Sequence, residues 1–149
     1  MRKYALDANC YIDASHDAAA FAALSRFVAW AAPRLYVSSV VAAELRAGAR
    51  SARDRKTVED RVLGPFVRRG RVLTPSAAAW DALGRTLAVL REREGLQLAQ
   101  VPRSFVFDIL VAYSCREHGV TLVTGNTRDM RRIRRVFTFD STAPYPEAS

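Results

Sequence analysis

The sequence predicts an α/β sandwich built around a mostly parallel sheet. Short apolar runs typical of buried strands alternate with helical patterns along the chain, at residues 3–6, 35–37, 71–73, 120–124 and 136–139. This alternation favours parallel strands, because each helix carries the chain back before the next strand begins. The 149 residues suit a single domain, which we expect to span residues 1–140. The segment 141–149, with two prolines, is expected to be a poorly ordered tail.

The first helices of this alternation have clear ends in the sequence. Apolar residues recur at helical spacing over residues 21–31, and Pro33 stops that helix. After the second strand, Ser38 or Ser39 offers an N-cap for a helix that ends near Gly48. The first part of the chain therefore predicts alternating strands and helices.

The later helices are delimited by glycine and by capping residues. A charged helix over residues 50–61 is expected to end at the Gly64–Pro65 pair or at a turn soon after it. An apolar stripe predicts the next long helix, with Gly95 at its end. We expect Trp80 in the core, with an interface as the alternative. Ser104 is expected to cap the last long helix, which leads into the fourth strand.

The charge of the chain points to a class of partner. With 23 basic and 15 acidic residues, the net charge is +8, and such a protein suits a polyanion such as nucleic acid. Arginine supplies all the basic residues except Lys3 and Lys56. A GC-rich coding sequence also produces that bias, so the charge alone leaves the partner open.

Cysteine and hydropathy patterns argue against other classes of protein. Cys10 and Cys115 lie outside any CxxC pair, and His16 and His118 have no ligand spacing to them, which argues against a zinc site. Both thiols are expected to be buried. No apolar run approaches the roughly 20 residues that span a bilayer, and Asp7 interrupts the first run before a signal-peptide core can form. We therefore expect a cytoplasmic protein with no membrane partner.

Four acidic residues occupy positions where a lone carboxylate is costly. Asp7 and Asp129 follow strands, whose carboxyl ends line the ligand crevice of a parallel sheet. Glu44 and Asp108 interrupt apolar segments, where an unpaired charge is unfavourable. Each acid alone has an ordinary explanation as a turn, first-turn or solvated helix residue. Together, with no basic partner built into these segments, they imply a hard divalent cation, Mg²⁺ or Mn²⁺.

The segments around these acids resemble those of a PIN-domain ribonuclease, and more narrowly the VapC-type toxins of bacterial toxin–antitoxin pairs. The resemblance rests on four motifs in family order, LDANCYID at 6–13, SSVVAAELRAG at 38–48, FDILVA at 107–112 and LVTGNTRDM at 122–130. It implies a three-layer α/β/α fold with about five strands in the sheet.

The resemblance also implies a set of site residues. Asp7, Glu44 and Asp108 would be ligands of one or two Mg²⁺ or Mn²⁺ ions. The fourth position is open, because Asn126 stands where the family often has Asp. We expect Asp129 to supply the acidic charge there and Asn126 a hydrogen bond or a ligand oxygen. The residues expected to orient ligands or the scissile phosphate are Asn9 and Thr124.

The predicted activity is metal-dependent hydrolysis of RNA (tRNA, rRNA or mRNA) by a toxin that inhibits translation. Bound ions would activate a water and stabilise the leaving 3′-oxygen, giving a 5′-phosphate and a 3′-hydroxyl. The basic run after the fourth motif could grip the RNA backbone, although a solvated helix face explains it equally well: Arg128, Arg131, Arg132, Arg134 and Arg135.

Other functions remain as alternatives. A catalytically inactive PIN-like module that binds RNA or protein is one, although the full set of acids argues against it. A phosphatase of the haloacid-dehalogenase type would need an acid at residue 9, which is Asn, and a lysine beyond Lys56. The chain also lacks the GxSxG motif of many serine hydrolases. The family resemblance further implies a VapB-type antitoxin that blocks the acidic cleft, and a homodimer.

Overall fold

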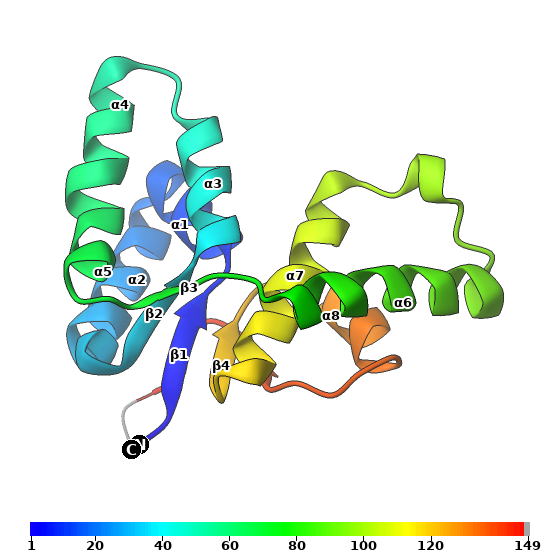
Figure 1. Ribbon diagram of the computed structural model, residues 1–149. Coiled ribbons are helices and arrows are strands. Elements are labelled where there is room, and N and C mark those ends of the chain that lie inside the picture. The colour runs from blue at the N-terminus through cyan, green and yellow to red at the C-terminus, as the bar shows by residue number, and fades with distance from the viewer. Residues whose placement is uncertain (148–149) are drawn as a thin grey trace.

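A computed structural model describes residues 1–147 and contains one five-stranded sheet (Figure 1). The strands are β1 (Lys3–Leu6), β2 (Leu35–Ser38), β3 (Val72–Leu73), β4 (Val120–Val123) and β5 (Ser141–Thr142), in the spatial order β3-β2-β1-β4-β5. Each neighbouring pair within this described part is parallel. The expected parallel α/β fold is therefore confirmed.

Helices fill the connections between these strands. The α-helices are α1 (Ala8–His16), α2 (Ala18–Ala31), α3 (Ser39–Gly48), α4 (Ala52–Thr57), α5 (Gly64–Arg68), α6 (Ala77–Glu94), α7 (Arg103–Glu117) and α8 (Thr127–Arg134). A π-helical segment (Val58–Leu63) joins α4 to α5, and two 3₁₀ turns lie at Ala32–Arg34 and Leu98–Gln100. Ser38 caps α3 through Oγ, and Gly95 ends α6 with φ 69°, a left-handed conformation that suits glycine.

Two apolar clusters cover the two faces of the sheet. Ala5 of β1 packs into a cluster with Val37, Leu122 and side chains of α3, α6, α7 and α8. Tyr4 and Leu6, its neighbours along the same strand, point the other way and pack with α1 and α2. Successive strand side chains alternate between faces, so one strand serves both clusters. The molecule thus has the expected three layers.

The sheet brings the predicted site residues to one edge. Leu6 is paired with Val123, so β1 and β4 end side by side. Asp7 follows β1 directly, and Thr124 follows β4. Because all strands run the same way, the N-terminus of α3 after β2 lies at this edge too.

The Gly64–Pro65 pair does not end the helix; the turn at Arg69 and Gly70 does, which is the second of the two ends expected from the sequence. The helix continues from α4 through the π-helical segment into α5. The N–H of Gly64 bonds to the carbonyl of Glu59, five residues earlier, and Pro65 lies in the first turn of α5. Proline is tolerated there because its missing N–H breaks no bond in a first turn.

Four further expectations are wrong. The last strand is Ser141–Thr142, which pairs with β4, instead of 136–139, so this part of the expected 141–149 tail is built into the sheet. Tyr145 also stacks on Phe27 of α2, while residues 148 and 149 lie outside the described part. Trp80 is 57% exposed instead of buried, and α7 begins one residue before Ser104, without a side-chain cap.

Two expectations from composition can be compared with the structure. Cys10 and Cys115 are both buried free thiols, as predicted. Within residues 1–147, no helix is both long and apolar enough to span a bilayer.

Candidate active site

Asp7 is fixed where β1 passes into α1. Its N–H continues the ladder to β4 by donating to the carbonyl of Val123 over 2.9 Å. Its carboxylate Oδ1 accepts from the N–H of Ala8 over 2.8 Å, so the side chain caps α1. Only 4% of Asp7 is exposed, so its second oxygen also needs partners from the protein.

Asn9 and Thr124 supply these partners. Thr124 Oγ1 donates to Oδ2 of Asp7 over 2.8 Å, and Asn9 Nδ2 lies 3.2 Å from the same oxygen. Asn9 Oδ1 in turn accepts from the N–H of Gly125 over 3.2 Å. These bonds tie the loop after β4 to the start of α1, and they hold Asp7 in one orientation.

Asp108 lies on α7 and is bound to the loop after β4. It is only 7% exposed, and its Oδ2 accepts from Asn126 Nδ2 over 2.9 Å. The same Asn126 nitrogen lies 3.0 Å from Oδ2 of Asp129. Asn126 therefore turns its NH₂ group, and not its carbonyl, toward the two acids, and acts here as a hydrogen-bond donor.

Glu44 and the two buried acids open into one pocket at the carboxyl edge of the sheet. Asp7, Glu44, Asp108 and Asn126 line this acidic pocket, which is open to solvent. Asp129 does not line it and reaches it only through Asn126. The remaining lining residues are Ala8, Asn9, Ile12, Asp13, Ser104 and Gly125.

Sequence reasoning passed over some of these lining residues. Asp13 lies one helical turn after Asn9 on α1, and Ser104 lies one turn before Asp108 on α7. Residues spaced by four share a face of a helix, so this spacing from the predicted site residues was the available signal. Ile12, beside Asp13, gives the pocket an exposed apolar rim.

The acids of the pocket repel one another. Burial raises the pKa of Asp108 to about 8, and the negative charges of Asp7, Asp129 and Glu44 add to that rise. Burial also raises the pKa of Asp7, against the hydrogen bonds from Thr124, Ala8 and Asn9. The pKa of Glu44 is raised by burial and by Asp7, and Arg103 partly offsets this. Such a site gains from a bound positive charge.

The donor set fits a hard divalent cation. Asp7, Glu44 and Asp108 offer carboxylate oxygens, the ligands that Mg²⁺ and Mn²⁺ prefer. Within residues 1–147, none of these three acids forms an ion pair with lysine or arginine. As the side chains stand, however, no three metal-binding groups in the described part lie close enough to hold an ion. Binding would therefore require these side chains to rotate toward one another.

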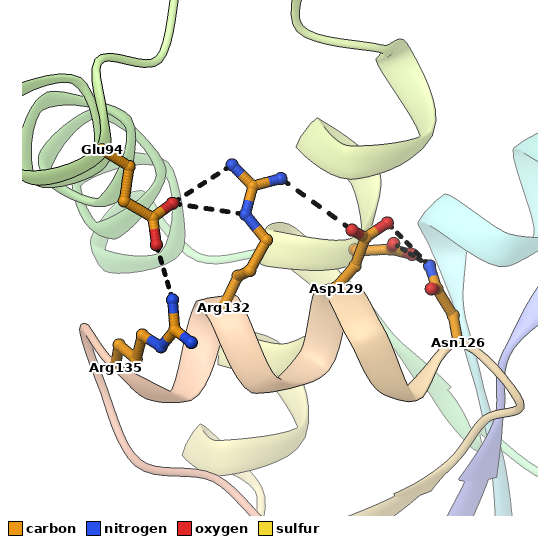
Figure 2. Close-up of polar contacts among 6 residues, drawn as sticks. Glu94, Asn126, Asp129, Arg132 and Arg135 are labelled. Atoms are coloured by element: carbon orange, nitrogen blue, oxygen red, sulfur yellow. Dashed lines mark hydrogen bonds and ion pairs between the residues drawn. The ribbon is translucent and has the colours of Figure 1, made fainter.

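The five arginines between positions 128 and 135 differ in their surroundings. Arg132 and Arg135 both donate to Glu94 at the end of α6 (Figure 2). Arg134 donates to Ser141. Arg128 and Arg131 are exposed and have no ion-pair partner within residues 1–147. Both side chains are thus exposed to solvent on α8, on either side of Asp129 in the sequence.

Comparisons with known proteins agree with this architecture. The model of the PIN domain family matches residues 4–136. Among solved structures, VapBC from Salmonella typhimurium bound to DNA is similar with a TM-score of 0.67 and 22% identity, over 97% of this chain and 100% of that one. FitAcB from Neisseria gonorrhoeae is similar with a TM-score of 0.68 and 18% identity, over 95% and 97%.

A third structure, VapBC2 from Rickettsia felis bound to a DNA fragment from its promoter, is similar with a TM-score of 0.61 and 23% identity, over 94% and 97%. At these identities the likeness concerns the fold. A search of curated proteins finds no relative that matches this sequence significantly.

Proposed function

Because this chain belongs to the PIN domain family, we propose that it is a divalent-metal-dependent ribonuclease and the VapC-type toxin of a toxin–antitoxin pair. The observation that carries the proposal is the acidic pocket, in which Asp7, Glu44 and Asp108 meet from three separate elements. Three buried or half-buried acids without a basic partner are unfavourable for stability alone. A cation-dependent function accounts for them.

In this proposal Asp7, Glu44 and Asp108 hold one or two Mg²⁺ or Mn²⁺ ions, and Asp129 contributes negative charge from behind Asn126. A bound ion lowers the pKa of its water and offsets the charge that develops on a phosphodiester. Thr124 and Asn9 keep Asp7 turned toward the pocket, as their hydrogen bonds to Oδ2 indicate. Arg128 and Arg131 contact the RNA backbone. Hydrolysis leaves a 5′-phosphate and a 3′-hydroxyl.

We propose a VapB-type antitoxin as the protein partner in the cytoplasm. The names VapBC and FitAcB of the similar structures support a two-protein complex. An apolar groove of about 570 Å³ between α2 and α5 offers a surface for it, with Phe21 60% exposed on its wall. Tyr11 lines this groove and the next residue, Ile12, lines the acidic pocket, so one bound segment could reach both. Phe21→Asp should abolish co-purification with a co-expressed candidate antitoxin.

The homodimer implied by the family resemblance also remains a proposal. Trp80 of α6 and Leu98 beyond its end are 57% and 54% exposed, and such large apolar side chains suit an interface. Sedimentation of the wild type and of Trp80→Glu tests this, because a charge at the interface should yield monomers.

The ribonuclease proposal is tested with the Asp108→Asn variant. Wild type and variant are incubated with total RNA extracted from the expression host, with Mg²⁺, with Mn²⁺, or with a chelator, and the new RNA ends are sequenced. We expect new 5′-phosphate ends only with wild type and metal. Equal cleavage by Asp108→Asn would refute the site. Binding of RNA without any cleavage by the wild type would favour the alternative, an inactive binding module.

A further inference from the structure

A chain of polar contacts runs from the end of α6 to the wall of the acidic pocket (Figure 2). Glu94 Oε2 accepts from both Nε and Nη2 of Arg132, each over 3.4 Å. Arg132 Nη1 lies 3.9 Å from Oδ1 of Asp129, three residues earlier on α8. The other oxygen of Asp129 accepts from Asn126, which also donates to Asp108. Five side chains from three helices and one loop are thus connected.

Arg132 is more buried than the arginines on either side of it. Its guanidinium lies over the ring of Phe105, 4.7 Å from the ring centre, and Phe105 is a buried residue of α7. Only 28% of the Arg132 side chain is exposed, compared with 65% for Arg135, which shares the same Glu94. Stacking and charge-assisted hydrogen bonds together select one conformation of a side chain that has many.

The far end of this chain of contacts determines the orientation of Asn126. A side-chain amide carries two hydrogens, and here Asp108 and Asp129 each accept from Asn126 Nδ2. The position of Asp129 therefore helps to set how Asn126 meets Asp108. Without Arg132, Asp129 would keep only the 3.0 Å bond from Asn126 to oppose its repulsion from Asp108.

We propose that Arg132, held by Glu94 and Phe105, is a positioning residue that fixes Asp129 and, through Asn126, the carboxylate of Asp108. This inference rests on the proposed ribonuclease function. It also separates Arg132 from the other arginines of α8, since each of its three nitrogens already faces a carboxylate. An RNA phosphate would have to displace Glu94 or Asp129 to reach it.

The test compares Arg132→Gln with Arg135→Gln in the full chain. Both variants remove a guanidinium bound to Glu94, one from α8 and one from its C-cap, but only Arg132 contacts Asp129. The first measurement is the NMR signal pair of the Asn126 side-chain amide in the metal-free protein, assigned by its loss in Asn126→Ser. The second is the dissociation constant for Mn²⁺, from electron paramagnetic resonance.

We expect Arg132→Gln to move the Asn126 signals and to weaken Mn²⁺ binding about tenfold, the effect of losing a partner that orients a ligand. Arg135→Gln should leave both measurements unchanged. Arg132→Lys keeps the charge but not the planar fork, so it should recover part of the loss. Glu94→Gln should also move the Asn126 signals and weaken Mn²⁺ binding. The double variant with Glu94→Gln and Arg132→Gln should show changes only slightly larger than those of Arg132→Gln alone, because the two residues belong to one chain of contacts.

Steady-state kinetics separates positioning from contact with RNA. A positioning role predicts that Arg132→Gln lowers kcat about tenfold with KM for RNA unchanged. A raised KM with unchanged kcat, or Asn126 signals identical to those of the wild type, would overturn the inference. If the wild type neither binds Mn²⁺ nor cleaves RNA, the proposed function fails, and the Asn126 signals still decide whether Arg132 positions this cluster.

Discussion

The hydroxyl of Thr124 donates to Oδ2 of Asp7 over 2.8 Å and joins the ends of two neighbouring strands. Thr124 Oγ1 also accepts from the N–H of Asn126 over 3.0 Å, and it lies 3.2 Å from Asn9 Nδ2. One buried hydroxyl thus serves the acid after β1 and the loop after β4. Its removal would leave the N–H of Asn126 without this acceptor and Oδ2 of Asp7 with only the bond from Asn9.

Thr124→Val should therefore weaken the site while the fold persists. The variant keeps the shape of threonine but removes the donor to Asp7 and the acceptor for Asn126, at a cost of about 1–3 kcal/mol in unfolding free energy. Mn²⁺ affinity should fall about tenfold. Urea denaturation and Mn²⁺ titration measure the two effects. Thr124→Ser keeps the hydroxyl and should stay close to wild type, so equal behaviour of the two variants would contradict this role.

Asp108 predicts a specific dependence of stability on pH. Its pKa is about 8 in the folded protein, above the value of 3.8 for a free side chain. Between these values the folded state binds more protons than the unfolded state, so the contribution of Asp108 to stability falls as pH rises and levels off above about 8. Asp7 and Glu44 have raised pKa values and act in the same direction.

Asp108→Asn isolates this contribution in the metal-free protein. The asparagine carries no charge and can still accept from Asn126, so the variant should be more stable than wild type by a margin that grows between pH 5 and pH 8. Since one pKa unit corresponds to about 1.4 kcal/mol, the increase should reach a few kcal/mol. Urea denaturation at several pH values with a chelator present measures it. A margin that does not change with pH would contradict the repulsion described here.

Saturating Mn²⁺ should make the wild type more stable than Asp108→Asn, the reverse of their order without metal. An ion that binds the folded wild type raises its melting temperature, because a ligand of the folded state shifts the unfolding equilibrium. The effect should be greater at pH 8 than at pH 6, since ion binding competes with the proton on Asp108. Asp108→Asn lacks one carboxylate and should gain much less. Differential scanning calorimetry with and without Mn²⁺ provides the comparison.

Arg128 and Arg131 should act on RNA binding alone. Both are exposed and have no ion-pair partner within residues 1–147, so their replacement disturbs no contact of the acidic pocket. Replacing both by Gln should raise KM for RNA and leave kcat unchanged. The slope of the logarithm of the binding constant against the logarithm of the salt concentration should become shallower by about 0.7 for each lost contact with single-stranded RNA. Binding measured at a series of salt concentrations tests this. An unchanged salt dependence would contradict the assignment.

The arrangement of the sheet was predictable because its signals are local. The runs at 3–6 and 120–124 combine apolar side chains with a following acid or turn, and the structure has strands there. The carboxyl-edge rule then placed Asp7 beside the loop after β4 without knowledge of contacts. The burial of Asp108 followed from its apolar neighbours in the same way.

Interactions between distant segments were not predictable from such signals. The bonds of Arg132 and Arg135 to Glu94 join residues about forty apart, and nothing in the basic run distinguishes these arginines from Arg128. The strand at 141–142 is short and polar, and it forms because β4 leaves an edge beside it. Trp80 fits the helical apolar spacing but faces solvent, because α6 buries a different face. Its buried residues are Ala79, Ala82, Leu83, Thr86 and Leu90.

Gly64 should tolerate no side chain, in contrast to Gly84. A Cβ at position 64 would lie 2.9 Å from the carbonyl oxygen of Glu59, which accepts the bond that closes the π-helical turn, so the backbone would have to shift. Gly64→Ala should therefore cost about 1–3 kcal/mol in unfolding free energy. At Gly84, inside α6, an added Cβ meets nothing within 4 Å, and alanine should stabilise the helix by about 0.5–1 kcal/mol. Changes of opposite sign in the unfolding free energies of Gly64→Ala and Gly84→Ala, measured by urea denaturation, would support the π-helical turn. A stabilising Gly64→Ala would mean that the helix has ordinary α-helical hydrogen bonds at this point.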